Sequence, residues 1–273
     1  MSWYKLVFKQ NQPIHIGSSK WGVFKETDIF VSGQIMWGAL VNSYLRKNGF
    51  QNIEEVQKSF ERISNFFPAF DESNFLKLSY KNGEFYLEEF SETEFRLCFV
   101  DTFVQTAVEP VSRKAKDESL HEIDYLLPRP KKDFYEKLKE KGFKGNLYWM
   151  GVIYIDSESI KNFIEKGLKM YVGADSRYGY GELEIVSKEE LKDSNNTIFQ
   201  IENNKVKINK NNNSLYFIPL SNDITFEGEI ELLGEFDFTK NKPKMTGAKF
   251  YISVGSKVDK EISGDLKKGK VVF

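Results

Sequence analysis

A nine-residue segment with three glycines, at positions 173–181, carries the strongest chemical signal in the sequence. Glycine permits positive φ angles and close approach of a ligand, and the backbone amides of such a loop can bind phosphate. An arginine there can pair bidentately with phosphate, and a tyrosine can stack on a base. The segment predicts a phosphate-binding loop, with an ordinary turn between helix and strand as the alternative. The candidate binding residues are Gly173, Ser176, Arg177, Tyr178, Gly179 and Tyr180.

A second candidate is the polar stretch 106–130, which contains several prolines and shows little periodicity. Arg113, Lys114 and Lys116 give it a basic segment, and a basic loop of this kind can wrap a strand of RNA and order on binding. Five acidic residues in the same stretch offset these charges. A solvated loop without a ligand is therefore the alternative.

A third candidate lies ahead of the first expected helix, where His15, Lys20 and Trp21 stand in a segment rich in glycine and serine. Trp21 in a polar loop either stacks on a base or fills a gap in the core. His15 and His121 are the two histidines of the chain and could act as acid and base on RNA, but nothing in the sequence places them together. No Ser/His/Asp arrangement can be recognised locally.

Composition limits the chemistry further. Cys98 is the single cysteine, so no intramolecular disulfide can form, and a zinc site would need carboxylates beside the histidines. We therefore predict no metal and no cofactor. The net charge of −1 lacks the basic excess of many free nucleic-acid binders, which favours a local RNA site or affinity shared with partners. Without a signal peptide or a long apolar run, the sequence indicates a cytoplasmic protein.

The pattern of apolar residues predicts the elements that position these loops. Ser32-Gly33 begins a helix that ends at Gly49, and a second helix runs from about Ile53 to Pro68. Asn82-Gly83 predicts the turn of a hairpin over 76–90. Further strands are expected at 3–8, 95–108, 146–155 and 182–186, with helices around 134–141 and 157–168. Residues 187–214 are expected to form an exposed hairpin or insertion, and residues 215–273 to be rich in strands.

Several of these segments resemble the RAMP superfamily of CRISPR proteins. Residues 173–181 resemble its glycine-rich loop, which lies between the last helix and last strand of a ferredoxin-like domain. Residues 13–17 and 32–40 resemble its first loop and first helix, and residues 106–127 resemble its long central hairpin. Residues 254–265 are similar to the closing strand of the subunits that cap the 5′ end of the guide RNA in type III complexes.

This resemblance implies an α+β fold: a ferredoxin-like, RRM-type RAMP domain over residues 1–186, with a hairpin insertion at about 106–133, and a β-rich, degenerate RRM-like region over 187–273. It also implies a non-catalytic subunit of a CRISPR effector complex in antiviral defence. Such a subunit binds the 5′ handle of the crRNA, caps the backbone filament, and touches a neighbouring RAMP subunit and often a large effector or nuclease subunit.

Two alternatives stay open from the sequence. The first is a metal-independent endoribonuclease of the same superfamily, which would process the guide RNA with His15 or His121 and a lysine as acid and base. The second is a scaffold that contacts only proteins.

Overall fold

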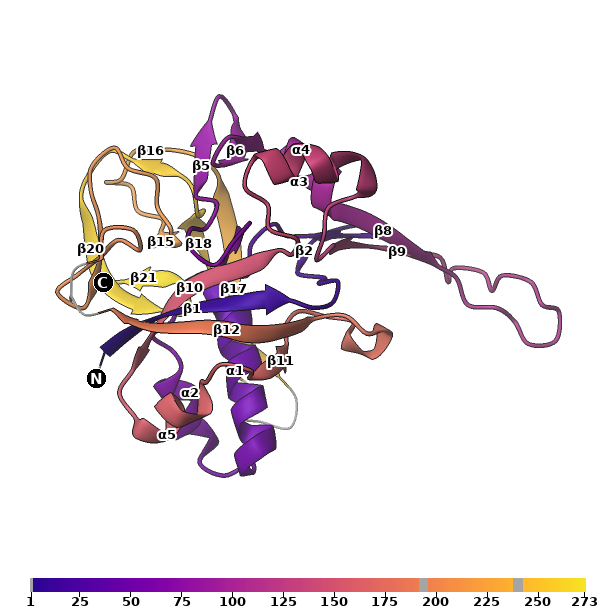
Figure 1. The fold of residues 1–273 in the computed structure, drawn as a ribbon, viewed down its shortest axis with the longest axis horizontal. Helices are drawn as coiled ribbons and strands as arrows, with labels where there is room; N and C mark the ends of the chain where they lie inside the picture. The colour runs from indigo at the N-terminus through magenta and orange to yellow at the C-terminus, as the bar shows by residue number, and fades with distance from the viewer. Residues whose placement is uncertain (1, 192–195, 238–242) are drawn as a thin grey trace.

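A computed structural model describes residues 2–191, 196–237 and 243–273. Its centre is a five-stranded antiparallel sheet with the strand order β11-β12-β1-β10-β4 (Figure 1). The predicted mixture of helices and strands is confirmed. The strands of this central sheet are β1 (Ser2–Gln10), β4 (Phe67–Ala69), β10 (Tyr148–Ile155), β11 (Lys169–Tyr171) and β12 (Glu182–Leu191).

The middle strand β1 is buried on both of its faces. It pairs with β10 on one side and β12 on the other, and the consecutive residues Leu6, Val7 and Phe8 are all fully buried. Successive residues of a strand point to opposite faces, so both faces of the sheet are covered at this point. Figure 1 shows α1 (Gly33–Asn48), α2 (Ile53–Ser59) and α5 (Glu158–Phe163) gathered on one side of the sheet.

The first helix follows its sequence signals, whereas the second does not. In α1 the Ser32 hydroxyl accepts a hydrogen bond from the Ile35 amide, and Gly49 ends the helix with a φ of +89°. The prediction of a helix from Ile53 to Pro68 is wrong beyond Ser59. The apolar residues from Ile63 onward are buried, Ile63 and Phe66 form isolated bridges with other segments, and the run ends in the edge strand β4. Here the regularly spaced apolar residues are spaced by their burial in the core, and they do not indicate a helix.

A predicted hairpin is confirmed at β5 (Leu78–Lys81) and β6 (Glu84–Leu87), which also pairs with β7 (Phe90–Ser91). The turn residues Asn82 and Gly83 both have positive φ. The strand predicted at 95–108 is wrong in its first part, because α3 (Glu92–Phe99) begins there with a capping box between Ser91 and Glu94. Its second part is the strand β8 (Val100–Gln105).

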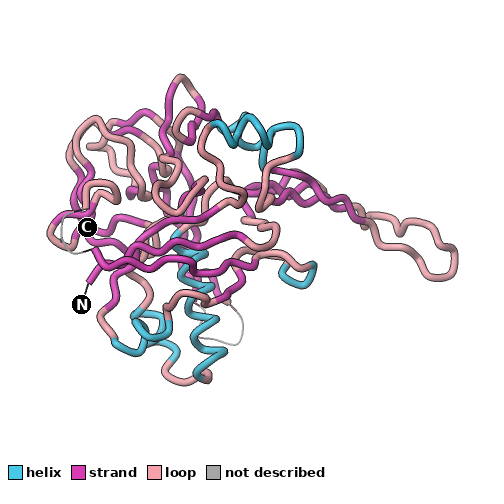
Figure 2. The backbone as a smooth tube through the Cα atoms, viewed as in Figure 1, coloured by secondary structure: helices cyan, strands magenta, loops and turns pink. Residues whose placement is uncertain are grey.

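A long arm projects from the body of the protein (Figure 1). It is the hairpin of β8 and β9 (His121–Leu126), which continues a sheet formed with β2 (Gly17–Trp21) and β3 (Phe24–Thr27). The tube in Figure 2 shows that the tip of the arm is loop, and all of residues 106–118 are exposed. The short helices η1 (Lys132–Phe134) and α4 (Tyr135–Glu140) follow the arm where a helix was predicted.

The C-terminal third is rich in strands, as predicted. One sheet has the order β13-β14-β20-β21, a second β15-β18-β17, and β16 pairs with β19. The strands are β13 (Ile201–Glu202), β14 (Lys205–Ile208), β15 (Ile218–Pro219), β16 (Phe226–Glu227), β17 (Ile230–Asp237), β18 (Lys244–Ile252), β19 (Lys257–Val258), β20 (Ile262–Lys267) and β21 (Lys270–Val272).

The N-terminal and C-terminal regions share one hydrophobic core. The buried Asn65 joins them, since its side chain accepts a hydrogen bond from the Gly33 amide and donates to the Leu215 and Gly269 carbonyls. The division into parts at residues 186 and 187 stays a prediction, and it falls inside β12, which runs on to Leu191. Residues 192–195 of the predicted insertion lie outside the described part of the chain.

Candidate RNA-binding surface

The glycine-rich loop connects β11 to β12 and packs on the segment that follows β1. The Ala174 amide donates a hydrogen bond to the His15 carbonyl at 2.9 Å, and the Gly181 amide donates to the Pro13 carbonyl at 2.7 Å. Gly173 has a φ of +83°, and a Cβ there would lie 2.2 Å from the His15 carbonyl oxygen. Only glycine fits at this position, so two of the three sequence candidates are joined by backbone contacts that require it.

The crest of the loop is a single turn of 3₁₀ helix, η2 (Ser176–Tyr178), whose three residues are all exposed. The Tyr178 ring is 54% exposed. The Arg177 guanidinium makes no ion pair with any residue in the described part of the chain. The loop therefore presents one positive charge and one aromatic ring to solvent, together with the exposed backbone of Gly173 and Gly179.

The prediction that Tyr180 is an RNA-binding residue of this loop is corrected by the structure, because the Tyr180 side chain points inward. It is 9% exposed, and its ring lies 5.3 Å, centroid to centroid, from that of Tyr125 on the arm. Burial, with the nearby Asp175, raises the pKa of the Tyr180 hydroxyl, and burial with Asp101 does the same for Tyr125. Both tyrosines therefore stay protonated, and their rings attach the glycine-rich loop to the base of the arm.

His15 is a second correction, since it is buried at 3% exposure beneath the loop. Its Nδ1 lies 2.7 Å from the Asp124 carbonyl oxygen on β9, and its own carbonyl accepts the bond from Ala174. His15 therefore joins three segments and is out of reach of a ligand on the surface. His121 lies in β9, with Nε2 3.1 Å from the Gln105 side chain, so the two histidines form no common site.

A groove runs between the glycine-rich loop and α1. Its wider part has a volume of about 640 Å³, and a hollow of about 370 Å³ adjoins it and shares Asn42, Tyr171 and Gly173 in its wall. Asn42 and Arg46 lie one turn apart on the exposed face of α1. Within the described residues Arg46 makes no ion pair, and Ser176 and Gly179 line the wall opposite.

This groove contains residues that the sequence analysis missed. Neither Arg46 nor Tyr171, which is 51% exposed, was singled out as a candidate from the sequence. The signal for Arg46 was its spacing, because it repeats at four-residue intervals with Gly38 and Asn42 along one helix face. Gly38 has no side chain at this face, so a ligand can approach the helix backbone there.

Lys20 and Trp21 lie on the exposed edge strand β2, where Trp21 is 69% exposed. They belong to the same sheet as the arm and not to the wall of the groove. Arg113, Lys114 and Lys116 lie at the exposed tip of the arm. The predicted residues therefore lie in three separate places: at the glycine-rich loop beside the groove, on the edge strand β2, and at the tip of the arm.

Five apolar side chains of the arm are also exposed, with exposed fractions from 41% to 94%. The apolar residues are Phe103, Val104, Val108, Val111 and Leu120.

Comparison with known proteins identifies the fold. No protein-family model matches the sequence, and no curated protein matches it. Among solved structures, a chain of the type III-B Cmr-beta complex bound to cognate target RNA and AMPPnP matches with a TM-score of 0.62 and 14% identity, over 93% of this chain and 85% of that one. The chain has the fold of a type III CRISPR subunit. The predicted resemblance to RAMP proteins is thus confirmed at the level of fold.

Two further structures agree. A chain of Cmr-beta bound to cognate target RNA gives a TM-score of 0.61 at 14% identity, covering 93% of this chain and 86% of that one. A chain of the Csm3-Csm4 subcomplex of the type III-A interference complex gives 0.50 at 13% identity, covering 100% and 98%. No helix among the described residues is long and apolar enough to cross a membrane. The described residues hold no cluster of three or more potential metal ligands.

Proposed function

We propose that this protein is a non-catalytic subunit of a type III CRISPR effector complex, which binds the 5′ handle of the crRNA and caps the backbone filament. The observation that carries the proposal is the shared fold over 93% of the chain with a chain of an RNA-bound type III-B complex. The groove beside the glycine-rich loop supports it, because Arg46 lines the groove and Arg177 is exposed on the loop that forms its wall, both without ion-pair partners in the described part of the chain, and exposed backbone lies beside them.

The strand order supports a ferredoxin-like domain within this fold. In chain order, β1, α1, β4, β10, α5 and β12 alternate as two β-α-β units, and they assemble in the sheet order β12-β1-β10-β4. The glycine-rich loop precedes the last strand of this arrangement and lies at the end of the sheet beside α1. On this proposal a single strand of RNA lies in the groove, with phosphates on Arg46 and Arg177 and one base stacked on Tyr171 or Tyr178.

The burial of His15 supports a non-catalytic role. An acid–base mechanism on the 2′-hydroxyl needs side chains within hydrogen-bond reach of the RNA. His15 is enclosed and held by the Asp124 carbonyl, and His121 is held by Gln105 on the arm, away from the groove lining. Incubation of the protein with repeat RNA in EDTA tests this point. Site-specific cleavage that disappears in His121→Ala would replace the proposal with the endoribonuclease alternative.

RNA binding is tested directly by fluorescence anisotropy with a labelled RNA that carries the repeat-derived handle. We expect Arg177→Gln and Arg46→Gln each to weaken binding about tenfold, because a charge-assisted hydrogen bond contributes roughly 1.5–3 kcal/mol. Each variant should also reduce the slope of log affinity against log salt by about 0.7, the value for one phosphate contact on a single strand. Arg177→Lys should recover the slope but not the full affinity, since lysine cannot bind bidentately.

The matched control is Arg129→Gln, which removes an exposed arginine outside the groove. It should leave affinity and slope unchanged. If Arg177→Gln and Arg46→Gln bind the handle RNA like the wild type, the groove is not the RNA site; if the wild type itself shows no binding, the chain contacts protein only and the scaffold alternative holds. Competition with a scrambled RNA then separates handle recognition from general affinity for single strands.

A further inference from the structure

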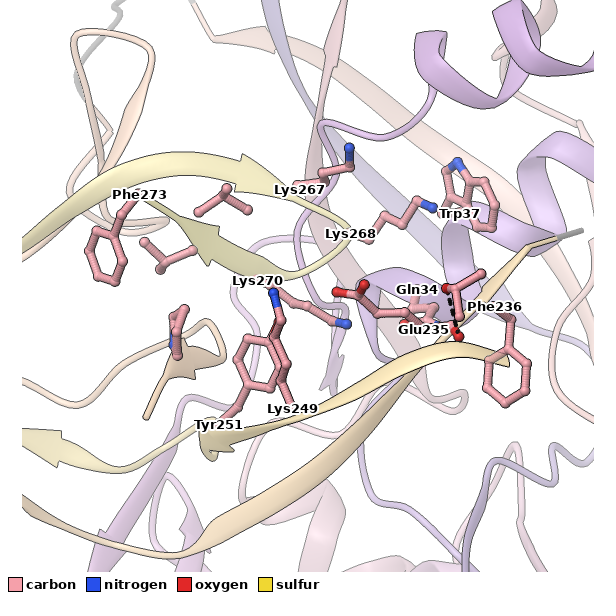
Figure 3. Close-up of a pocket in the computed structure, with 14 residues that line it drawn as sticks. Gln34, Trp37, Glu235, Phe236, Lys249, Tyr251, Lys267, Lys268, Lys270 and Phe273 are labelled. Carbon is pink, nitrogen blue, oxygen red and sulfur yellow. Dashed lines mark hydrogen bonds between the residues drawn. The ribbon is translucent and has the colours of Figure 1, made fainter. Parts of the chain in front are cut away.

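A second cavity, of about 560 Å³, lies beside the N-terminal half of α1 and is lined by lysines (Figure 3). Gln34 and Trp37 form its wall on α1, whereas Gly38 and Asn42 line the groove described above. The opposite wall comes from β17, β18 and the turn between β20 and β21. Its lysines are Lys249, Lys267, Lys268 and Lys270. Glu235 is the one carboxylate among the lining residues.

Lys270 is the most enclosed of these lysines, at 8% exposure. Its ammonium lies 5.1 Å from the centroid of the Tyr251 ring, and it makes no hydrogen bond or ion pair with the described residues. Figure 3 shows its side chain directed into the cavity toward Glu235. An ammonium group has three donors, and an apolar ring satisfies none of them fully, so Lys270 lacks an acceptor.

Lys268, on the same turn, also has an ammonium group beside an aromatic ring and without an acceptor among the described residues. Its backbone has a φ of +50°, and its ammonium lies 3.5 Å from the centroid of the Trp37 ring. It forms no ion pair with the described residues, whereas its neighbour Lys267 pairs with Glu61 at 3.0 Å. The turn is therefore held in a conformation that places two ammonium groups without acceptors at one cavity.

The charges around the cavity are not balanced. Burial, with the charges of Lys267 and Lys270, lowers the pKa of Lys268, and burial with Lys249 lowers that of Lys270. Glu235 raises the pKa of both lysines, and Glu61 raises that of Lys268, but the lowering by burial is larger. Enclosed like charges without acceptors destabilise a fold. A bound anion would supply the acceptors and offset the repulsion.

We propose that this lysine pocket binds a phosphate group, carried by an RNA backbone or by a free nucleotide. Lysine ammoniums act as point charges toward the several oxygens of a phosphate. A volume of about 560 Å³ is of the size that holds a nucleotide. The exposed rings of Phe236 and Phe273 also line the pocket, where a base can stack. This site is distinct from the groove and does not depend on the groove binding RNA.

The test compares the full-length wild type with Lys270→Met, which keeps the aliphatic stem and removes the charge. One arm measures anisotropy of a labelled single-stranded RNA of arbitrary sequence over a series of salt concentrations. The other measures binding of adenosine monophosphate and of inorganic phosphate by calorimetry. If RNA is the source, Lys270→Met weakens RNA binding about tenfold and reduces the salt slope by about 0.7. If a nucleotide is the source, the calorimetric signal is lost instead.

The control Lys257→Met removes an exposed lysine that lines none of these cavities, and it should behave as wild type in both arms. Lys249→Met serves as a second pocket variant at an exposed position, in case Lys270→Met fails to fold. Without ligand, Lys270→Met should melt at a higher temperature than the wild type. The proposal is overturned if both pocket variants match Lys257→Met in RNA affinity, salt slope and nucleotide binding. RNA binding by Arg46→Gln and Arg177→Gln tests the groove independently of the lysine pocket.

Discussion

Replacing Asp28 by asparagine should stabilise the protein at neutral and alkaline pH. Asp28 lies in a cleft between β3 and β17, where burial raises the pKa of its carboxyl from 3.8 to about 7, with the nearby Glu231 acting in the same direction. The ion pairs of Arg96 go to Glu26 and Glu92, so its attraction lowers the Asp28 pKa only partly. Above pH 7 the folded protein must therefore hold this carboxylate in a site that disfavours its charge.

The expected magnitude follows from this pKa difference. Above pH 7 the folded protein must keep ionised a carboxyl whose pKa is about 7 in the folded state and near 3.8 in the unfolded state. At about 1.4 kcal/mol per unit of pKa, this lowers the free energy of unfolding by about 4 kcal/mol. Between these two values the folded state binds more protons than the unfolded state, so stability falls as pH rises and levels off above about 7. Asparagine keeps the oxygen that accepts the 2.7 Å hydrogen bond from the Ile29 amide.

We expect Asp28→Asn to raise the free energy of unfolding at pH 8 by about 2 kcal/mol, half of the full value, because water entering the cleft reduces the cost in the wild type. Urea unfolding at several pH values from 4.5 to 8.5 measures this. Asp265→Asn, at an exposed carboxylate on β20, is the control and should leave the curve unchanged. Part of the slope between pH 5 and 7 should remain in Asp28→Asn, because burial also raises the pKa of Glu231 to about 7. A slope in Asp28→Asn as steep as in the wild type would refute the reasoning.

Three further changes test the fold and the arm. Gly173→Ala should cost about 2 kcal/mol or more in urea unfolding, because its Cβ would collide with the His15 carbonyl, whereas Gly179→Ala meets no atom and should cost only about 1 kcal/mol for its positive φ. Asn65→Ala should cost about 3 kcal/mol and lower the melting temperature, since it removes the partner of the Gly33 amide and of the Leu215 carbonyl, and one of the two hydrogen bonds to the Gly269 carbonyl. Replacing residues 107–118 by Asn-Gly should leave stability unchanged, because the segment is almost wholly exposed, while anisotropy shows weaker RNA binding.

The glycine-rich loop was predictable because its requirement is local. A chain that must turn with positive φ between two strands selects glycine, and the same residues are the ones that permit close backbone contact. What the sequence did not indicate is which side chains of the loop face outward. Tyr178 and Tyr180 are two residues apart, and the Tyr125 ring, far away in sequence, decides that Tyr180 is the buried one.

The errors have a similar cause. His15 looked available because it lies in a polar segment, yet its burial depends on β9 and on the loop at 174, both distant in sequence. The stripe from Val56 to Phe67 has helical spacing, but Ile63 bridges to Ile153 and Phe66 to Val31, and these pairings require an extended chain. Short apolar runs fit either structure, and tertiary pairing decides between them.

The helix α1 links the two proposed anion-binding sites, the groove and the lysine pocket, through one close backbone contact. At its first turn a Cβ on Gly33 would lie 2.4 Å from the Gly269 backbone nitrogen, so helix and turn touch without an intervening side chain. Asn65 fixes both glycines at this contact. The turn that carries Lys268 and Lys270 is therefore attached to the helix that carries Arg46. Displacement of this turn should disturb the groove and the lysine pocket together, although the two share no side chain in their linings.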